Sequence, residues 1–231
     1  MSSSENNPVV LVHGWGGSFR DTWQKPGIDA LLEDIGRQVV PFNLLGHADQ
    51  EKPTDPEAYG LLPQWFLEHL PDEIPVIDAV GFSLGALTIL RALIQDPQRF
   101  GRVILAGIGD GVFVKSGPNA NQKIIDALEG NLSEDDELGR MFSHYGNQPG
   151  NDIAALTAIM KRPPSEPIDP AVLSEITNEV LVVIGDKDFT FPAEKLASSF
   201  PNGRLVVLKN TDHFSTPDSF SFIDHILDFF A

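Results

Sequence analysis

The feature that most constrains the fold is an alternation of short apolar segments with segments of helical spacing. The apolar segments predict buried strands at Pro8–Val12, Gln38–Phe42, Pro75–Val80, Val103–Ala106, Val180–Ile184 and Arg204–Leu208. Short apolar strands that alternate with helices are typical of parallel sheets covered by helices on both faces. The sequence therefore predicts an α/β fold with a mostly parallel sheet of about six strands.

This alternation is interrupted once, after the fourth predicted strand. From Gly107 to Ser174 only two segments have helical spacing, Asn121–Glu129 and Ile153–Met160, and prolines cluster near the end of the stretch. A chain of 231 residues is long enough for one domain with a modest insertion. We therefore expect a core formed by residues 1–106 and 175–231, with residues 107–174 as a mostly helical insertion.

The chain is strongly acidic, with a formal net charge of −17. The acidic residues are scattered along the sequence and do not form a tail. Such a surface repels nucleic-acid backbones and anionic lipids. We therefore expect neither nucleic acid nor a membrane as a partner, and we expect strongly anionic small molecules to meet the protein slowly.

The chain contains no cysteine, which excludes disulfides, a thiol nucleophile and cysteine-ligated metals. No histidine pair has the H-E-x-x-H spacing of a metal site, so we expect neither a metal nor another cofactor. The first residues lack the basic and apolar parts of a secretory signal, and no apolar run is long enough to span a membrane. These observations predict a cytoplasmic protein.

A glycine-flanked serine, Gly81-Phe82-Ser83-Leu84-Gly85, follows the third predicted strand and precedes a helical segment. It matches the pattern G-x-S-x-G in its required strand-to-helix context. There the serine stands on a sharp turn at the start of a helix, which favours a developing negative charge. The alternative is an ordinary turn made of small residues. Ser83 is the candidate nucleophile.

A second glycine-rich segment, His13-Gly14-Trp15-Gly16-Gly17, directly follows the first predicted strand. Glycines let a backbone approach a substrate closely, and acyl transfer needs backbone N–H donors for its oxyanion. The alternative is a common glycine-rich turn. The segment has neither G-x-G-x-x-G nor a Gly-Lys-Ser/Thr ending, so a phosphate-binding loop is disfavoured.

Two further polar residues follow later strands. Asp186 and Asp188 stand at the end of the fifth strand, where a carboxylate can orient a histidine. His213 stands past the sixth strand, and histidine is the usual general base at neutral pH. Because parallel strands end at the same edge of a sheet, we expect these residues to lie near Ser83.

Together these four motifs resemble the α/β-hydrolase family, whose catalytic residues also follow the order Ser, Asp, His. The resemblance implies a triad of Ser83, Asp188 and His213. It favours Asp188 over Asp186 because the family pattern is Gly-x-x-Asp, and it leaves Asp110 as an alternative acid. It also implies an oxyanion hole formed by the backbone N–H groups of Trp15 and Leu84, and a cap at residues 107–174.

The function that this resemblance implies is hydrolysis of a carboxylic ester, with Trp15 beside the substrate pocket. The cap sequence offers apolar side chains and no cluster of Lys or Arg, which favours a small-molecule ester with a small or medium neutral acyl group. C–C bond hydrolases, thioesterases, amidases and perhydrolases use the same triad and remain alternatives. A non-catalytic ligand-binding relative is the alternative from another class.

Overall fold

The computed structural model describes residues 6–117, 119–132 and 135–231. Within these residues one sheet contains six strands, all of them parallel to their neighbours. The strands are β1 (Val9–Val12), β2 (Val39–Phe42), β3 (Ile77–Phe82), β4 (Phe100–Ala106), β5 (Val180–Gly185) and β6 (Gly203–Leu208). Their order in the sheet is β2-β1-β3-β4-β5-β6. The structure thus confirms the predicted α/β fold and its parallel sheet.

Alternate residues of the central strands enter two separate apolar layers. In β1, for example, Val10 and Val12 pack into one layer, and Val9 and Leu11 pack into the other. This follows from the two-residue repeat of a strand. Both layers exclude water from β1, β3 and β5, whose residues are all buried, and this explains why these strands are apolar except for Asp78 in β3.

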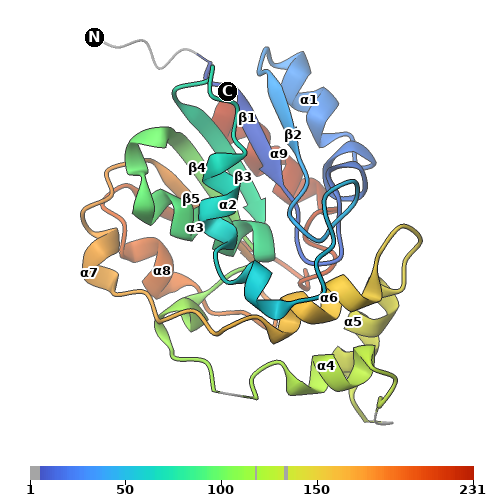
Figure 1. The fold of residues 1–231 in the computed structure, drawn as a ribbon. Coiled ribbons are helices and arrows are strands. Elements are labelled where there is room, and N and C mark those ends of the chain that lie inside the picture. Colours follow the sequence, from blue (N-terminus) through green and yellow to red (C-terminus); the bar gives the residue numbers. More distant parts are fainter. Residues whose placement is uncertain (1–5, 118, 133–134) are drawn as a thin grey trace.

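Helices cover both faces of the sheet, as Figure 1 shows. The layer that contains Val9 is closed by α1 (Ile28–Asp34) and α9 (Phe220–Phe230). The other layer is closed by α2 (Leu62–Glu68), α3 (Leu84–Gln95) and α8 (Glu194–Ser198). Shorter helical turns are η1 (Arg20–Gln24), η2 (Pro56–Tyr59) and η3 (Pro97–Arg99). In the described part of the chain, no helix is both long enough and apolar enough to cross a membrane.

Residues 107–174 contribute no strand where the structure describes them, and their longer helices gather at one end of the sheet (Figure 1). The helices of this segment are η4 (Asp110–Phe113), α4 (Gln122–Leu128), α5 (Glu137–Gly146), α6 (Ile153–Lys161) and α7 (Pro170–Leu173). The sequence predicted α4 and α6 but missed α5. Leu138, Met141, Phe142 and Tyr145 of α5 do have helical spacing, and the Asp136 N-cap accepts a hydrogen bond from Gly139 N, so the local signal was present and was overlooked.

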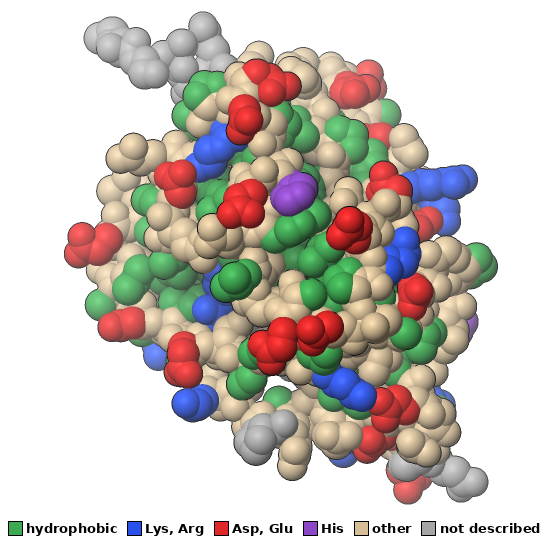
Figure 2. Space-filling view, in the orientation of Figure 1, with side chains coloured by type: hydrophobic (Ala, Val, Ile, Leu, Met, Phe, Trp, Pro, Cys, Tyr) green, Lys and Arg blue, Asp and Glu red, His purple; other side chains and the backbone are tan. Residues whose placement is uncertain are grey.

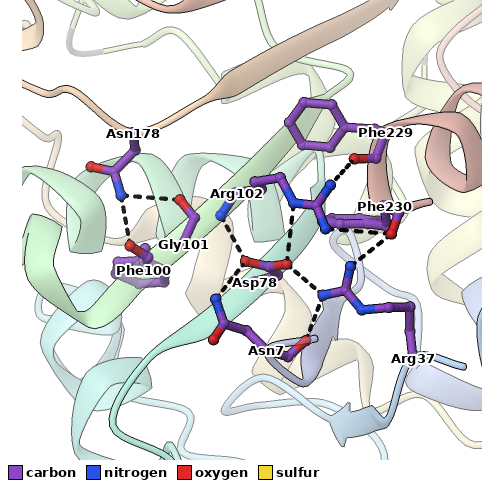
Figure 3. Close-up of polar contacts among 9 residues, drawn as sticks. All are labelled: Asn7, Arg37, Asp78, Phe100, Gly101, Arg102, Asn178, Phe229 and Phe230. Atoms are coloured by element: carbon purple, nitrogen blue, oxygen red, sulfur yellow. Dashed lines mark hydrogen bonds and ion pairs between the residues drawn. The ribbon is translucent and has the colours of Figure 1, made fainter. Parts of the chain in front are cut away.

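A buried ion pair holds the opposite end of the sheet together (Figure 3). The guanidinium of Arg37 lies 2.5 Å from Asp78 Oδ2, and both side chains are almost completely buried. Arg37 also donates to the carbonyl oxygens of Asn7 and Phe230, which ties the end of α9 to the start of β1. Asp78 additionally accepts from the backbone N–H of Arg102 in β4. This cluster therefore links three strands and the last helix.

Two buried histidines fix the loops at the site end of the sheet. His13 Nε2 accepts a hydrogen bond from Leu44 N, and His47 Nε2 accepts one from Gly16 N. The Nδ1 atoms lie near carbonyl oxygens, so each ring is neutral with its proton on Nδ1. The rings meet edge to face with their centroids 4.8 Å apart. The loop after β1 is therefore held in place by the loop after β2.

We predict that replacing Asp78 by Asn will destabilise the fold, because it leaves Arg37 buried without a counter-charge. The expected loss is about 3–5 kcal/mol of unfolding free energy in urea denaturation. The matched control is Glu166→Gln, which removes the exposed ion pair of Glu166 with Lys115 and should change stability by less than about 1 kcal/mol. Equal effects of the two substitutions would contradict this role of the buried pair.

We also predict an acid-sensitive fold. Burial lowers the pKa of His13 from 6.5 to about 4, and burial together with the nearby His13 lowers that of His47 to about 3. Between pH 6.5 and those values the unfolded chain binds protons that the folded chain excludes, so stability falls as the pH falls. The pair should contribute a loss of about 3–4 kcal/mol from pH 7 to pH 5.

Urea denaturation at pH 7, 6 and 5 measures this loss. In His47→Gln the loss of unfolding free energy between pH 7 and pH 5 that is due to the pair should be about half as large. Only His13 then remains as a histidine that binds a proton in the unfolded chain and not in the folded one. A pH profile that is the same in wild type and in His47→Gln would contradict the prediction.

Candidate active site

Ser83 stands on a strained turn between β3 and α3. Its backbone has φ 52° and ψ −112°, in a region that residues with a side chain rarely adopt. The turn leaves Ser83 partly exposed, although the residues on both sides of it are buried. The structure therefore presents this hydroxyl at the carboxyl edge of the sheet, as the G-x-S-x-G pattern predicts.

The flanking glycines are required because the chain is crowded at this turn. A Cβ atom on Gly81 would lie 2.7 Å from the backbone of Ala86. A Cβ atom on Gly85 would lie 2.4 Å from the carbonyl oxygen of Val12, at the end of β1. Side chains at either position would push α3 away from the sheet. The close approach of α3 to β1 thus depends on both glycines.

Three predicted residues are brought together in a hydrogen-bonded line. Ser83 Oγ lies 2.9 Å from His213 Nε2, and His213 Nδ1 lies 2.9 Å and 3.0 Å from the two carboxylate oxygens of Asp188. Because a carboxylate only accepts, the proton of His213 stands on Nδ1 and leaves Nε2 free to accept from the Ser83 hydroxyl. His213 and Asp188 are both buried, so bulk water does not compete for these contacts.

The loop after β5 keeps Asp188 ionised. Both the backbone N–H and the hydroxyl of Thr190 donate to Asp188 Oδ1 at 2.8 Å. Burial alone would raise the pKa of Asp188, but the hydrogen bonds from His213 and Thr190 outweigh it and hold the pKa below its ordinary value. The carboxylate is therefore negatively charged at neutral pH and can stabilise a protonated His213.

The two other candidate acids lie elsewhere. The carboxylate of Asp110 accepts from Lys195 N and Leu196 N in the first turn of α8, where it complements the positive end of that helix. Asp186 is exposed and accepts from Thr211 N. Of the three aspartates considered from the sequence, Asp188 is the one hydrogen-bonded to His213.

The loop after β1 lies directly beside Ser83. A Cβ atom on Gly14 would lie 3.3 Å from Ser83 Cβ, so the backbone of this loop passes close to the serine. Among the described residues, the backbone N–H groups of Trp15 and Leu84 donate no hydrogen bond within turns or loops. The Trp15 indole differs from the expectation that it borders the pocket. It is buried against Phe142, and its Nε1 donates to Leu156 O in α6.

A large cavity opens beside the line of three residues, with a volume of about 1140 Å³. Leu84 borders it on one side, and Phe189, whose ring centroid lies 4.4 Å from that of His213, borders it on another. Much of the wall is apolar and comes from α3, η4, α4 and the end of α6. Described residues between Ile108 and Pro167 thus line much of the cavity, and we call them the roof.

The cavity wall also carries cationic side chains, among them Arg91 from α3 and Arg162 from the end of α6. The sequence interpretation expected no cluster of Lys or Arg at the pocket. It missed this pair because the two residues are far apart in the chain and one of them lies outside the insertion. The described residues contain no group of three or more His, Cys, Asp or Glu that could hold a metal ion.

Comparison with known proteins supports the fold. No curated protein sequence matches the chain. Several solved structures do, including an esterase from a marine microorganism, with 19% identity, 98% of this chain and 96% of that chain covered and a TM-score of 0.67. A hydrolase from Pseudomonas aeruginosa has 22% identity, with 99% and 91% covered and a TM-score of 0.69.

A third similar structure is 2-hydroxy-6-oxo-6-phenylhexa-2,4-dienoate hydrolase from a Rhodococcus strain. It shares 20% identity, with 96% of this chain and 89% of that chain covered and a TM-score of 0.63. At these identities the likeness concerns the fold. The sequence pattern of the alpha/beta hydrolase family, however, matches residues 9–221, which is most of the chain. The chain therefore belongs to the alpha/beta hydrolase family.

Proposed function

We propose that this chain is a serine hydrolase that cleaves carboxylic esters, with Ser83 as nucleophile, His213 as base and Asp188 as acid. The observation that carries the proposal is the hydrogen-bonded line from Ser83 Oγ through His213 to an ionised Asp188, on a strained turn beside a cavity. This is the arrangement that activates a serine hydroxyl, which is a weak nucleophile when it stands alone.

In the proposed reaction, Ser83 Oγ attacks the ester carbonyl carbon while His213 Nε2 takes its proton. The carbonyl oxygen becomes negatively charged, and the N–H groups of Trp15 and Leu84 donate to it. His213 then gives its proton to the departing alcohol, which leaves an acyl group on Ser83. A water molecule, deprotonated by His213, attacks this acyl group and releases the acid.

The cavity supports an ester with a small or medium acyl group. Leu84, next to Ser83, and Phe189, which contacts His213, border the cavity, and its apolar walls favour hydrocarbon until the space is full, at about 0.8 kcal/mol for each buried CH₂. One similar structure is an esterase, which agrees with this substrate class. The dienoate hydrolase among the similar structures makes C–C bond hydrolysis the second candidate, since both reactions begin with the same nucleophile.

We predict that Ser83→Ala will lower kcat for p-nitrophenyl butyrate by about 10⁴–10⁶-fold, because the nucleophile is gone while the fold is kept. A fluorophosphonate probe should label the wild type and fail to label the variant. The control is Ser198→Ala, which changes an exposed serine on α8 and should leave both measurements unchanged. Turnover of Ser83→Ala within tenfold of wild type would show that another group is the nucleophile.

We further predict that Asp188→Asn will lower kcat by about 10⁴-fold, because an amide at this position favours the wrong tautomer of His213. Asp110→Asn is the matched control, since Asp110 is the alternative acid and contacts α8 instead of His213. It should keep kcat within about threefold of wild type. Steady-state kinetics on the same ester measures both, and a severe loss in Asp110→Asn with an active Asp188→Asn would reverse the assignment.

A further inference from the structure

The cavity beside Ser83 carries two positive charges that have no carboxylate partner in the described part of the chain. Arg91 lies on the face of α3 that lines the cavity, together with Leu84 and Thr88. Arg162 directly follows α6 and reaches the same cavity from the roof. The cavity is therefore bordered by one guanidinium from the core and one from the segment above it.

Each guanidinium is held by the protein backbone. Arg91 Nη2 donates to Glu166 O at 2.8 Å, and Arg162 Nη1 donates to Ile159 O at 2.7 Å. These contacts use one N–H group of each fork and fix the side chains near the cavity. A guanidinium has five N–H donors, so each arginine retains others for a ligand.

The remaining charged side chains on the wall are already paired. Glu129 forms an ion pair with Lys161, and Glu166 forms one with Lys115. Neither glutamate is within ion-pair distance of Arg91 or Arg162 among the described residues. The two arginines are thus the unmatched charges of this cavity.

The two arginines also repel one another. Burial, followed by the charge of Arg91, lowers the pKa of Arg162 to about 10, and burial lowers that of Arg91 as well. Both remain protonated at neutral pH. Two like charges in a partly dehydrated space are unfavourable until an anion lies between them. The arrangement contrasts with the outer surface, where acidic side chains are spread over the face shown in Figure 2.

The separation between Ser83 and this pair sets the length of a ligand. Arg91 follows Ser83 by eight residues in α3, which places their backbones about 12 Å apart along the helix axis. An extended acyl chain of six to eight carbons has about the length of this axial separation, so it is the length we choose for a ligand that runs from Ser83 toward Arg91. Planar carboxylates bind such forks through two parallel hydrogen bonds.

We propose that Arg91 and Arg162 form a carboxylate-binding subsite, so that the preferred esters carry a free carboxylate at the far end of the acyl chain. The subsite rests on the proposed ester hydrolysis for its place in the reaction. It replaces the neutral acyl group expected from the sequence by one with an apolar middle and an anionic end. The apolar walls then hold the methylene chain between the two polar ends.

The test compares two esters of equal chain length, mono-p-nitrophenyl octanedioate and its methyl ester, at constant ionic strength. We expect wild-type kcat/KM to favour the free carboxylate by at least about tenfold, the effect of one charge-assisted hydrogen bond. Arg91→Gln and Arg162→Gln should each reduce that ratio by about tenfold. A general loss of activity lowers kcat/KM for both esters by the same factor and leaves their ratio unchanged. The ratio therefore reports on recognition of the carboxylate alone.

Lys161→Gln is the matched control, because Lys161 is next to Arg162 and on the same wall but is paired with Glu129. It should leave the ratio within about twofold of wild type. A wild-type ratio near one, or a ratio that neither arginine substitution changes, would overturn the subsite. If neither ester is hydrolysed, the proposed function fails, and the subsite is then tested by binding.

For that test, monomethyl octanedioate is titrated calorimetrically into Ser83→Ala, which cannot turn it over. Binding that weakens about tenfold when Arg162→Gln is added supports the subsite whatever the reaction is. Absence of binding to Ser83→Ala, or equal binding with and without Arg162, overturns it.

Discussion

The whole arrangement depends on one constraint, the parallel direction of all six strands. Because every strand runs the same way, the segments that follow β1, β3, β5 and β6 meet at one edge of the sheet. Ser83, Asp188 and His213 are distant in sequence, yet each stands just beyond one of these strands. The strand order and the register already bring these three residues to the same edge, so no additional contact is needed for that.

The strands and the three hydrogen-bonded residues could be predicted because their signals are local. A short apolar run between glycines and polar residues indicates a buried strand wherever it occurs. The Ser83 turn likewise has its pattern within five residues. The pair of Arg91 and Arg162 has no such pattern, because one member belongs to α3 and the other to the roof. Helix α5 was missed although Leu138, Met141, Phe142 and Tyr145 have helical spacing, because polar residues and two glycines separate them in a short segment.

The electrostatics of the molecule have two opposite parts. The formal net charge of −17 slows the approach of anions from a distance, and salt weakens that effect. Inside the cavity, Arg91 and Arg162 attract an anion at close range, where water screens less. A carboxylate would therefore be weakly repelled by the net charge on approach, but it would gain more binding free energy from the two arginines at the subsite. Selectivity for such a group would reside in binding and less in the rate of encounter.

The roof and the loop after β1 are linked by hydrogen bonds. The Trp15 indole donates to Leu156 O in α6, and Asn151 Nδ2, at the start of the same helix region, donates to Gly16 O. On its other side this loop is held by His47, which accepts from Gly16 N. A shift of α6 would therefore move the loop backbone at Trp15 and Gly16, where we propose one donor of the oxyanion hole. Since Arg162 ends the same helix, the proposed subsite and the proposed oxyanion hole would be connected through α6.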